Sequence, residues 1–252
     1  MPEFILNIRP FVDSVRDSDS LKRRGVSSLI LPLLEIIPLI FTPPDAAGIA
    51  NLIFTSRHAV AAFAAQIDMA NWADKQLFVV GHATAAAARQ AGFSRIITGT
   101  GGGRGLVPQI MCRQSAVPGR FLWPAGADKS FDMAAALGDY GHRVDILATY
   151  AARPVTSPDQ SVIDKIADGA ITAAIVMSSR SAALLSTLFA TDALAHRRAE
   201  ITLIVGSASI ATAAGHGWRD IHTAIRPRRS RLLAMATLLY HHQNSIPTAK
   251  GR

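Results

Sequence analysis

The chain has 252 residues, of which 49% are hydrophobic and 17% charged, a balance that excludes a disordered protein and is long enough for one large domain or two modest ones. The net charge of +8 and an isoelectric point near 10.4 favour an anionic partner, which composition leaves open between nucleic acid, phosphates, a membrane surface and a polycarboxylate. The single cysteine, Cys112, excludes an internal disulfide and a cysteine metal cluster.

The apolar segments are too interrupted for a membrane-spanning helix. The most apolar one, residues 29–41, is broken by Pro32, Glu35 and Pro38, whereas a spanning helix needs about 20 apolar residues. Residues 1–14 lack the basic start and long apolar run of an export signal. We therefore expect a cytoplasmic protein with no membrane partner.

Short β-rich runs alternate with longer alanine-rich helical stretches. Most of the short runs are continuously apolar, which is typical of strands buried on both faces in parallel sheets covered by helices. The sequence therefore predicts an α/β protein with parallel sheets. The expected strands, in chain order, are residues 4–8, 28–32, 51–55, 77–81, 95–99, 120–124, 143–148, 173–178, 202–206 and 221–225.

Two pairs of segments repeat in the same order along the chain. Residues 51–66 resemble residues 174–189, and residues 78–92 resemble residues 203–217. The match aligns Thr55 with Ser178 and Thr84 with Ser209. The two hydroxyl residues are 29 positions apart in the first copy and 31 positions apart in the second. Two motifs at nearly one interval indicate an internal duplication.

The remaining strand-bearing segments also match, but in permuted order. Residues 4–32 open the chain, whereas their counterparts, residues 120–148, follow the first copy of the repeated motifs. Proline at the two crossings between the copies suits an extended linker. This order predicts a discontinuous domain of residues 1–36 with 153–252, an inserted domain of residues 40–150, and linker crossings at 37–39 and 151–152.

Hydroxyl and glycine residues stand where the repeated strands give way to helices. In open parallel sheets, ligands bind beyond the carboxyl ends of the strands, and the first N–H groups of each helix suit a carboxylate there. We expect glycine to let the backbone turn tightly before two of these helices. Plain helix capping is the alternative for the hydroxyl groups. The candidate binding residues are Thr55, Ser56, Gly81, Thr84, Ser178, Ser179, Gly206 and Ser209.

Two further residues are candidates on position alone. Arg9 follows the first strand and could hold an acidic group with its fork of donors, or be a solvated loop arginine. Tyr150 lies at the second crossing and could be a proton donor or hydrogen-bond anchor, or a packing aromatic at a hinge.

Other motifs carry little chemistry. The glycine-rich stretch 98–106 lacks the Lys-Ser/Thr of a phosphate-binding loop, so we interpret it as a flexible loop. The histidines show no metal-ligand spacing, and no nucleophile motif is present. We therefore expect no metal site.

The combination of these motifs resembles the uroporphyrinogen-III synthase family. The resemblance covers nearly the whole chain and depends on the order and spacing of short motifs. They are Arg9-Pro10, Thr55-Ser56, Ser178-Ser179, the G-x-x-[ST] starts at 81–84 and 206–209, a tyrosine at the second crossing, and the closing helix from residue 226.

The resemblance implies two flavodoxin-like parallel-sheet domains joined by a two-stranded β-ladder. It implies cyclisation of hydroxymethylbilane to uroporphyrinogen III with inversion of ring D and loss of water, without a cofactor, in tetrapyrrole and haem biosynthesis. The substrate carries acetate and propionate groups, which suits a basic protein with several helix N-termini. Tyr150 would then be the catalytic general acid, and the candidate binding residues with Arg9 would line the substrate site.

Two departures from the family pattern bear on the site residues. Ser209 stands where threonine is usual, and Arg104 lies in a loop where acidic residues are common. The alternatives are a non-catalytic two-domain binder of a tetrapyrrole or small polyanion, and a nucleic-acid-binding module motivated by the isoelectric point. The basic clusters are short and lack interleaved aromatics, so we do not expect a nucleic-acid partner. The resemblance implies a small polycarboxylate as the partner, and we expect a monomer.

Overall fold

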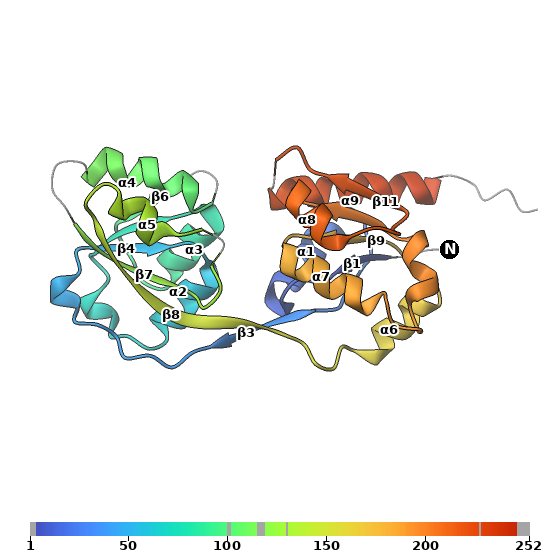
Figure 1. The fold of residues 1–252 in the computed structure, drawn as a ribbon, viewed down its shortest axis with the longest axis horizontal. Coiled ribbons are helices and arrows are strands. Elements are labelled where there is room, and N and C mark those ends of the chain that lie inside the picture. The colour runs from blue at the N-terminus through green and yellow to red at the C-terminus, as the bar shows by residue number, and fades with distance from the viewer. Residues whose placement is uncertain (1–3, 100–101, 115–118, 130, 227, 246–252) are drawn as a thin grey trace, which may run out of the picture. The chain divides into compact units, whose positions relative to one another are not determined.

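The computed structural model describes residues 4–99, 102–114, 119–129, 131–226 and 228–245. The chain divides into two compact units (Figure 1). Unit 1 combines residues 1–35 with residues 153–252, and unit 2 is the continuous stretch of residues 36–152.

Unit 1 contains a five-stranded sheet in which every neighbouring pair is parallel. Its order is β11 (Asp220–Thr223), β10 (Thr202–Val205), β9 (Ile171–Val176), β1 (Phe4–Asn7) and β2 (Ser28–Ile30). Its helices are α1 (Phe11–Lys22), α6 (Gln160–Ala167), α7 (Ser179–Leu188), α8 (Ala208–Ala214) and α9 (Arg229–Ser245), with a short 3-10 segment, η4 (Ala195–Glu200).

Helices cover both faces of this sheet, which explains the continuous apolar runs of its strands. In β9, Ala174 and Val176 pack in one core with α6, α7 and α8. The alternate residues Ala173 and Ile175 pack in a second core with α1 and α9. Successive side chains of a strand point to opposite faces, so a central strand between two helical layers must be apolar at every position.

Unit 2 contains a six-stranded sheet. Its order is β3 (Leu34–Pro38), β8 (Arg143–Pro154), β7 (Arg120–Gly126), β4 (Asn51–Phe54), β5 (Gln76–Val79) and β6 (Ile96–Thr98). Its helices are α2 (Arg57–Ala64), α3 (His82–Gln90), α4 (Val107–Gln114) and α5 (Met133–Gly138), with 3-10 segments η1 (Ala46–Gly48), η2 (Met69–Asn71) and η3 (Arg104–Leu106). One core lies under α2 and α3 and the other under α4 and α5.

The two sheets have the same spatial order when their strands are matched in permuted sequence. Strands β9, β10 and β11 of unit 1 correspond to β4, β5 and β6 of unit 2, and β1 and β2 correspond to β7 and β8. The helical layers correspond as well, because α7 and α8 share a core with β9 and β10 as α2 and α3 share one with β4 and β5. The internal duplication inferred from the sequence is thus present in the structure, and each predicted strand segment contains a strand.

Strand β3 is not among the strands predicted from apolar runs, and β8 is longer than its predicted run, although the family resemblance implied a two-stranded ladder. The amide of Leu39 donates to the carbonyl of Thr149 over 2.9 Å within unit 2, and the amide of Val155 donates to the carbonyl of Leu33 over 3.1 Å within unit 1. Residue numbers rise along β3 as they fall along β8, so the pair is antiparallel. Both strands cross the boundary between the two units along the chain.

Candidate functional site

The carboxyl ends of the parallel strands define one edge of each sheet, called here the carboxyl edge. In unit 2, β4 ends at Phe54, and Thr55 and Ser56 follow it before α2 begins. The hydroxyl of Ser56 accepts the amide N–H of His58 over 3.1 Å, which is an N-cap contact. The hydroxyl of Thr55 accepts the indole N–H of Trp123 over 3.2 Å. Each accepting hydroxyl keeps its own proton, which can be donated to a carboxylate.

The second strand end of unit 2 departs from expectation. Gly81 precedes α3 with φ 174° and ψ 175°, which is extended backbone that any residue adopts, so the predicted tight glycine turn is wrong. Gly206 is likewise not among the glycines of positive φ. A Cβ placed on Gly81 would meet no atom within 4 Å, so this part of the carboxyl edge is open. Thr84 is only 5% exposed, because it lies on the face of α3 that packs against the sheet.

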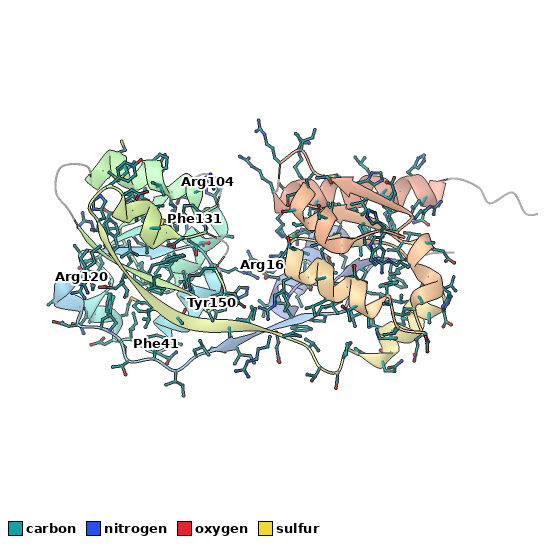
Figure 2. All side chains as sticks on the ribbon, viewed as in Figure 1. Arg16, Phe41, Arg104, Arg120, Phe131 and Tyr150 are labelled. Carbon is teal, nitrogen blue, oxygen red and sulfur yellow. The ribbon has the colours of Figure 1, made fainter. Side chains whose placement is uncertain are left out.

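Tyr150 lies on β8 opposite Gly126, the last residue of β7, at a register shift in the strand pair (Figure 2). Its half-buried side chain packs against the core under α2 and α3. The centre of its ring is 5.9 Å from that of His58, in the first turn of α2. The structure therefore brings Tyr150 close to the helix that Ser56 caps, at the carboxyl edge of unit 2.

In unit 1, hydroxyl groups gather where the neighbouring strands β9 and β10 end. Ser178 caps α7 by accepting the amide N–H of Ser181 over 3.0 Å. The exposed Ser179 donates to the carbonyl of Ser209 over 3.4 Å, and the hydroxyl of Ser209 is 2.9 Å from that of Ser207. Three predicted residues thus lie together, whereas Gly206 is buried. The sequence interpretation missed Ser207, although a serine before a helix is a recognisable N-cap signal.

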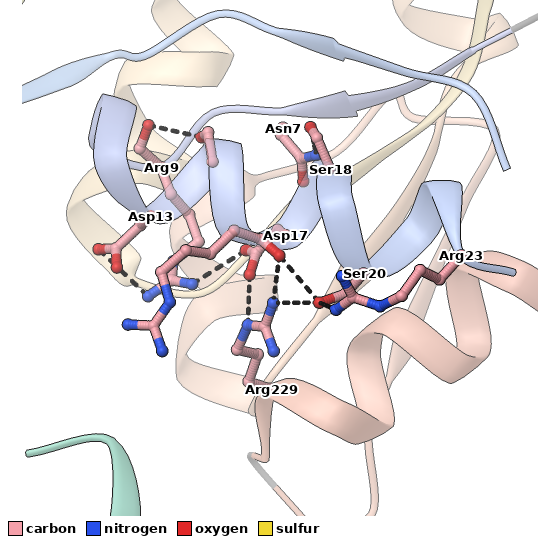
Figure 3. A network of polar contacts seen from close by, with 10 residues as sticks. Asn7, Arg9, Asp13, Asp17, Ser18, Ser20, Arg23 and Arg229 are labelled. Atoms are coloured by element: carbon pink, nitrogen blue, oxygen red, sulfur yellow. Dashed lines mark hydrogen bonds and ion pairs between the residues drawn. The ribbon is translucent and has the colours of Figure 1, made fainter. Parts of the chain in front are cut away.

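Arg9 is neither solvated nor unpaired, and the acidic groups that it holds belong to the protein itself (Figure 3). Its guanidinium contacts Asp17 over 2.9 Å and Asp13 over 3.3 Å, both on α1. The carboxyl group of Asp17 is fully buried and also pairs with Arg229, the first residue of α9. Arg229 donates further to the carbonyl of Arg16 over 2.7 Å and to Ser20 over 2.9 Å. Asp17 therefore joins α1 to α9 through Arg229, and Arg9 holds the end of β1 to α1 through the same carboxylate.

Part of the glycine-rich stretch forms the 3-10 segment η3, and residues 100–101 lie outside the described part of the chain. Arg104 lies over the ring of Phe131, with its guanidinium carbon 5.8 Å from the ring centre (Figure 2). A Cβ on Gly103 would stand 2.8 Å from the same ring, and one on Gly99 would stand 2.7 Å from Leu106. Gly99 and Gly103 thus allow close packing, and residues 104–106 are a 3-10 turn where the sequence predicted a loop.

No group of three or more histidine, cysteine, aspartate or glutamate side chains is placed to hold a metal ion in the described parts of the chain. Among the same residues, no helix combines the length and apolar character needed to cross a bilayer.

A family model described as uroporphyrinogen-III synthase HemD matches residues 16–234. The chain belongs to the uroporphyrinogen-III synthase family. The match takes in the candidate residues at the ends of β4, β5, β9 and β10, and Tyr150 on β8.

Solved structures of the uroporphyrinogen-III synthase family share this fold. The structure of a mutant uroporphyrinogen III synthase from the extremely thermophilic bacterium Thermus thermophilus is 15% identical, with a TM-score of 0.54, over 96% of this chain and 100% of that one. The uroporphyrinogen-III synthetase of Helicobacter pylori is 14% identical, with a TM-score of 0.60, over 94% and 99% of the two chains. A comparison with curated proteins found no match.

Proposed function

We propose that this protein cyclises hydroxymethylbilane to uroporphyrinogen III, with inversion of ring D and loss of water. The family match over residues 16–234 is the observation that carries this proposal. As a member of that family, the protein is a lyase of porphyrin biosynthesis. The structural part of the proposal is that hydroxyl and amide donors at the carboxyl edges bind the acetate and propionate groups of the substrate.

The sheets support the finer description of the fold, in which both units are flavodoxin-like. Numbered along the chain within unit 1, the strands have the order 2-1-3-4-5 of flavodoxin-like sheets. Unit 2 has the same spatial order from a different starting strand. In this description, β3 and β8 form the two-stranded ladder that joins the domains, which the hydrogen bonds of Leu39 and Val155 support.

The chemistry of the donors supports carboxylate binding. Helices α2, α3 and α7 begin at the carboxyl edges, so their first N–H groups and the positive ends of their dipoles favour negative charge there. The hydroxyl protons of Thr55, Ser56 and Ser179 add donors beside these helix starts. The open surface above Gly81 lets a carboxylate approach the backbone of α3.

Tyr150 is the proposed proton donor. Its phenol gives a proton to the terminal hydroxyl of the substrate, the C–O bond breaks, and water leaves an electron-poor azafulvene. The substituted carbon of ring D attacks the carbon that lost the hydroxyl, which forms a spiro intermediate. This intermediate fragments and recloses with ring D in the opposite sense. A proton is released as the last pyrrole ring regains aromaticity, and its return to the phenolate completes the cycle. The electron-rich rings drive the bond changes while the protein holds the reactive conformation.

The deciding experiment is an isomer assay. Purified protein receives hydroxymethylbilane generated in place, and the products are oxidised and separated by chromatography. We expect the type III isomer. Finding only the type I isomer, which forms spontaneously, would refute the proposal, and tight substrate binding without isomer control would point to a non-catalytic binder.

A further inference from the structure

Gly126 and Tyr150 are packed so closely that no side chain fits at position 126. A Cβ built on Gly126 would stand 2.8 Å from Cζ, 3.1 Å from Cε2 and 3.0 Å from the hydroxyl oxygen of Tyr150. Contacts below 3.0 Å require one of the two residues to move. The phenol end of Tyr150 therefore rests directly on the backbone of Gly126.

The backbone conformation does not explain this glycine. Gly126 is not among the residues of positive φ, so other residues could adopt its conformation. It is also the last residue of β7, opposite Tyr150 and next to a register shift in the pairing with β8, and glycine within a strand weakens the sheet. A strand glycine marks either such an irregularity or a close approach of another group, and the short distances identify the phenol as the approaching group here.

The surrounding contacts fix the backbone of both residues, so the ring and not the strand would have to shift. The amide of Ala127 donates to the carbonyl of Tyr150 over 2.8 Å. The buried hydroxyl of Thr149 donates to the carbonyl of Ala125 over 3.1 Å. The ring also lies near that of His58, with the two centres 5.9 Å apart.

We propose that Gly126 is a positioning residue for the reaction, because its missing side chain sets where the phenol of Tyr150 stands at the carboxyl edge of unit 2. This inference rests on the proposed function, in which Tyr150 donates the proton. A methyl group at position 126 displaces the hydroxyl from the departing oxygen while it leaves the carboxylate donors in place. The expected loss is therefore in kcat and not in KM.

The test is the variant Gly126→Ala, with Gly138→Ala as its matched control. Gly138 ends α5 in the same unit, and a Cβ there would meet no atom within 4 Å. The chain has three tyrosines, so uniform 3-fluorotyrosine labelling gives fluorine NMR signals that the Tyr150→Phe variant assigns. We expect Gly126→Ala to shift the Tyr150 signal and to lower kcat about ten- to a hundredfold, the scale of a misplacement of roughly 1 Å. Gly138→Ala should change neither.

A Tyr150 signal that stays in place in Gly126→Ala, or a kcat that remains at the wild-type value while Tyr150→Phe lowers it, would overturn the inference. If Tyr150→Phe itself keeps full turnover, the proton-donor role in the proposed function fails. Gly126 would then position a ring that takes no part in the reaction, although Gly126→Ala would still shift the fluorine signal of Tyr150. The two failures are thus distinguishable.

A second measurement covers the case in which Gly126→Ala does not fold. If the ring causes the clash, the added methyl group costs little once the ring is gone, so the double variant Gly126→Ala, Tyr150→Val should melt within a few degrees of Tyr150→Val alone. The opposite outcome is a double variant that loses as much stability relative to Tyr150→Val as Gly126→Ala loses relative to wild type. That result would show that the phenol is not the group that requires glycine at position 126.

Discussion

The indole N–H of Trp123, on β7, donates to the hydroxyl of Thr55, just beyond β4, over 3.2 Å. Trp123 is 2% exposed, so this bond pairs a buried donor and fixes the side chain of Thr55 at the carboxyl edge. The hydroxyl that we propose for substrate binding is therefore also the acceptor for a buried donor of the core.

Replacing Thr55 tests how much the bond from the indole of Trp123 contributes to stability. Thr55→Val leaves the indole N–H unpaired and should lower the free energy of unfolding by about 1–3 kcal/mol. Thr55→Ser keeps a hydroxyl and should cost less than half as much. Urea unfolding followed by tryptophan fluorescence measures both. Equal stability of the two variants would show that the indole does not depend on this hydroxyl.

The neighbouring serines Ser178 and Ser179 distinguish capping from binding. Ser178→Ala removes an N-cap and should lower stability by about 1 kcal/mol. Ser179 is exposed and its 3.4 Å bond to Ser209 is long, so Ser179→Ala should leave stability within about 0.5 kcal/mol of the wild type. Its KM for hydroxymethylbilane should rise severalfold. An unchanged KM for Ser179→Ala would remove this hydroxyl from the proposed site.

Tyr150→Phe keeps the ring on Gly126 and deletes only the hydroxyl. We expect kcat to fall about a hundredfold, within the range that general acid catalysis contributes, while the melting temperature stays unchanged. Steady-state kinetics with isomer analysis and thermal unfolding measure the two quantities. Undiminished turnover would assign the proton to another donor.

Asp17 is the shared acid of Arg9 and Arg229. Because Asp17→Asn leaves both arginines without this charge, it should lower the free energy of unfolding by about 1.5–3 kcal/mol, the range for hydrogen bonds to charged groups. Asp19→Asn changes an exposed acid on the same helix and should be nearly neutral. Denaturant titrations of the two variants provide the comparison, and similar stabilities would contradict the role given to Asp17.

Asp145 makes stability depend on acid pH. Burial raises the pKa of Asp145, but the hydrogen bonds and charges of Arg120 and Arg143 together lower it by more, so the net pKa lies below its ordinary value of 3.8. Such a carboxyl stabilises the fold at pH values above its unfolded pKa, and this contribution is lost as the pH falls through the folded pKa. The advantage of the wild type over Asp145→Asn should therefore be present at pH 7 and shrink below about pH 4.

The control for this prediction is Asp139→Asn, which removes one exposed acid from the same unit. Melting temperatures from pH 7 down to about pH 2.5 should converge for wild type and Asp145→Asn but keep a constant offset for the control. An offset for Asp145→Asn that does not change with pH would exclude the pairing as its cause.

The sequence predicted the strands well because their signal is local. In β9, every position from Ile171 to Val176 is buried, and a continuous apolar run reports this directly. The apolar pattern did not mark β3 because Pro38 suggested an extended linker crossing, and its pairing with β8 involves residues more than a hundred positions away, so only the family resemblance implied a ladder there. Such long-range pairing leaves no local pattern.

The candidate site divides in the same way. Ser56 and Ser178 were identified because an N-cap depends on residues two or three positions ahead. The network around Arg9 could not be predicted, since its partner Asp17 lies two turns along α1 and the second arginine on Asp17, Arg229, comes from the other end of the chain. Thr84 and Ser209 align in sequence but differ in burial, because α3 and α8 begin one position apart in the repeat.

The discontinuity of unit 1 sets an order of events during synthesis. A ribosome releases β1 and β2 long before β9, which must pair with β1 to complete the sheet. Unit 2 is continuous and can fold while the opening segment still waits with its apolar strands unpaired. A chain that ends at residue 152 would therefore contain all of unit 2 but only an incomplete unit 1, and the apolar residues of β1 and β2 are then the part most in need of a chaperone.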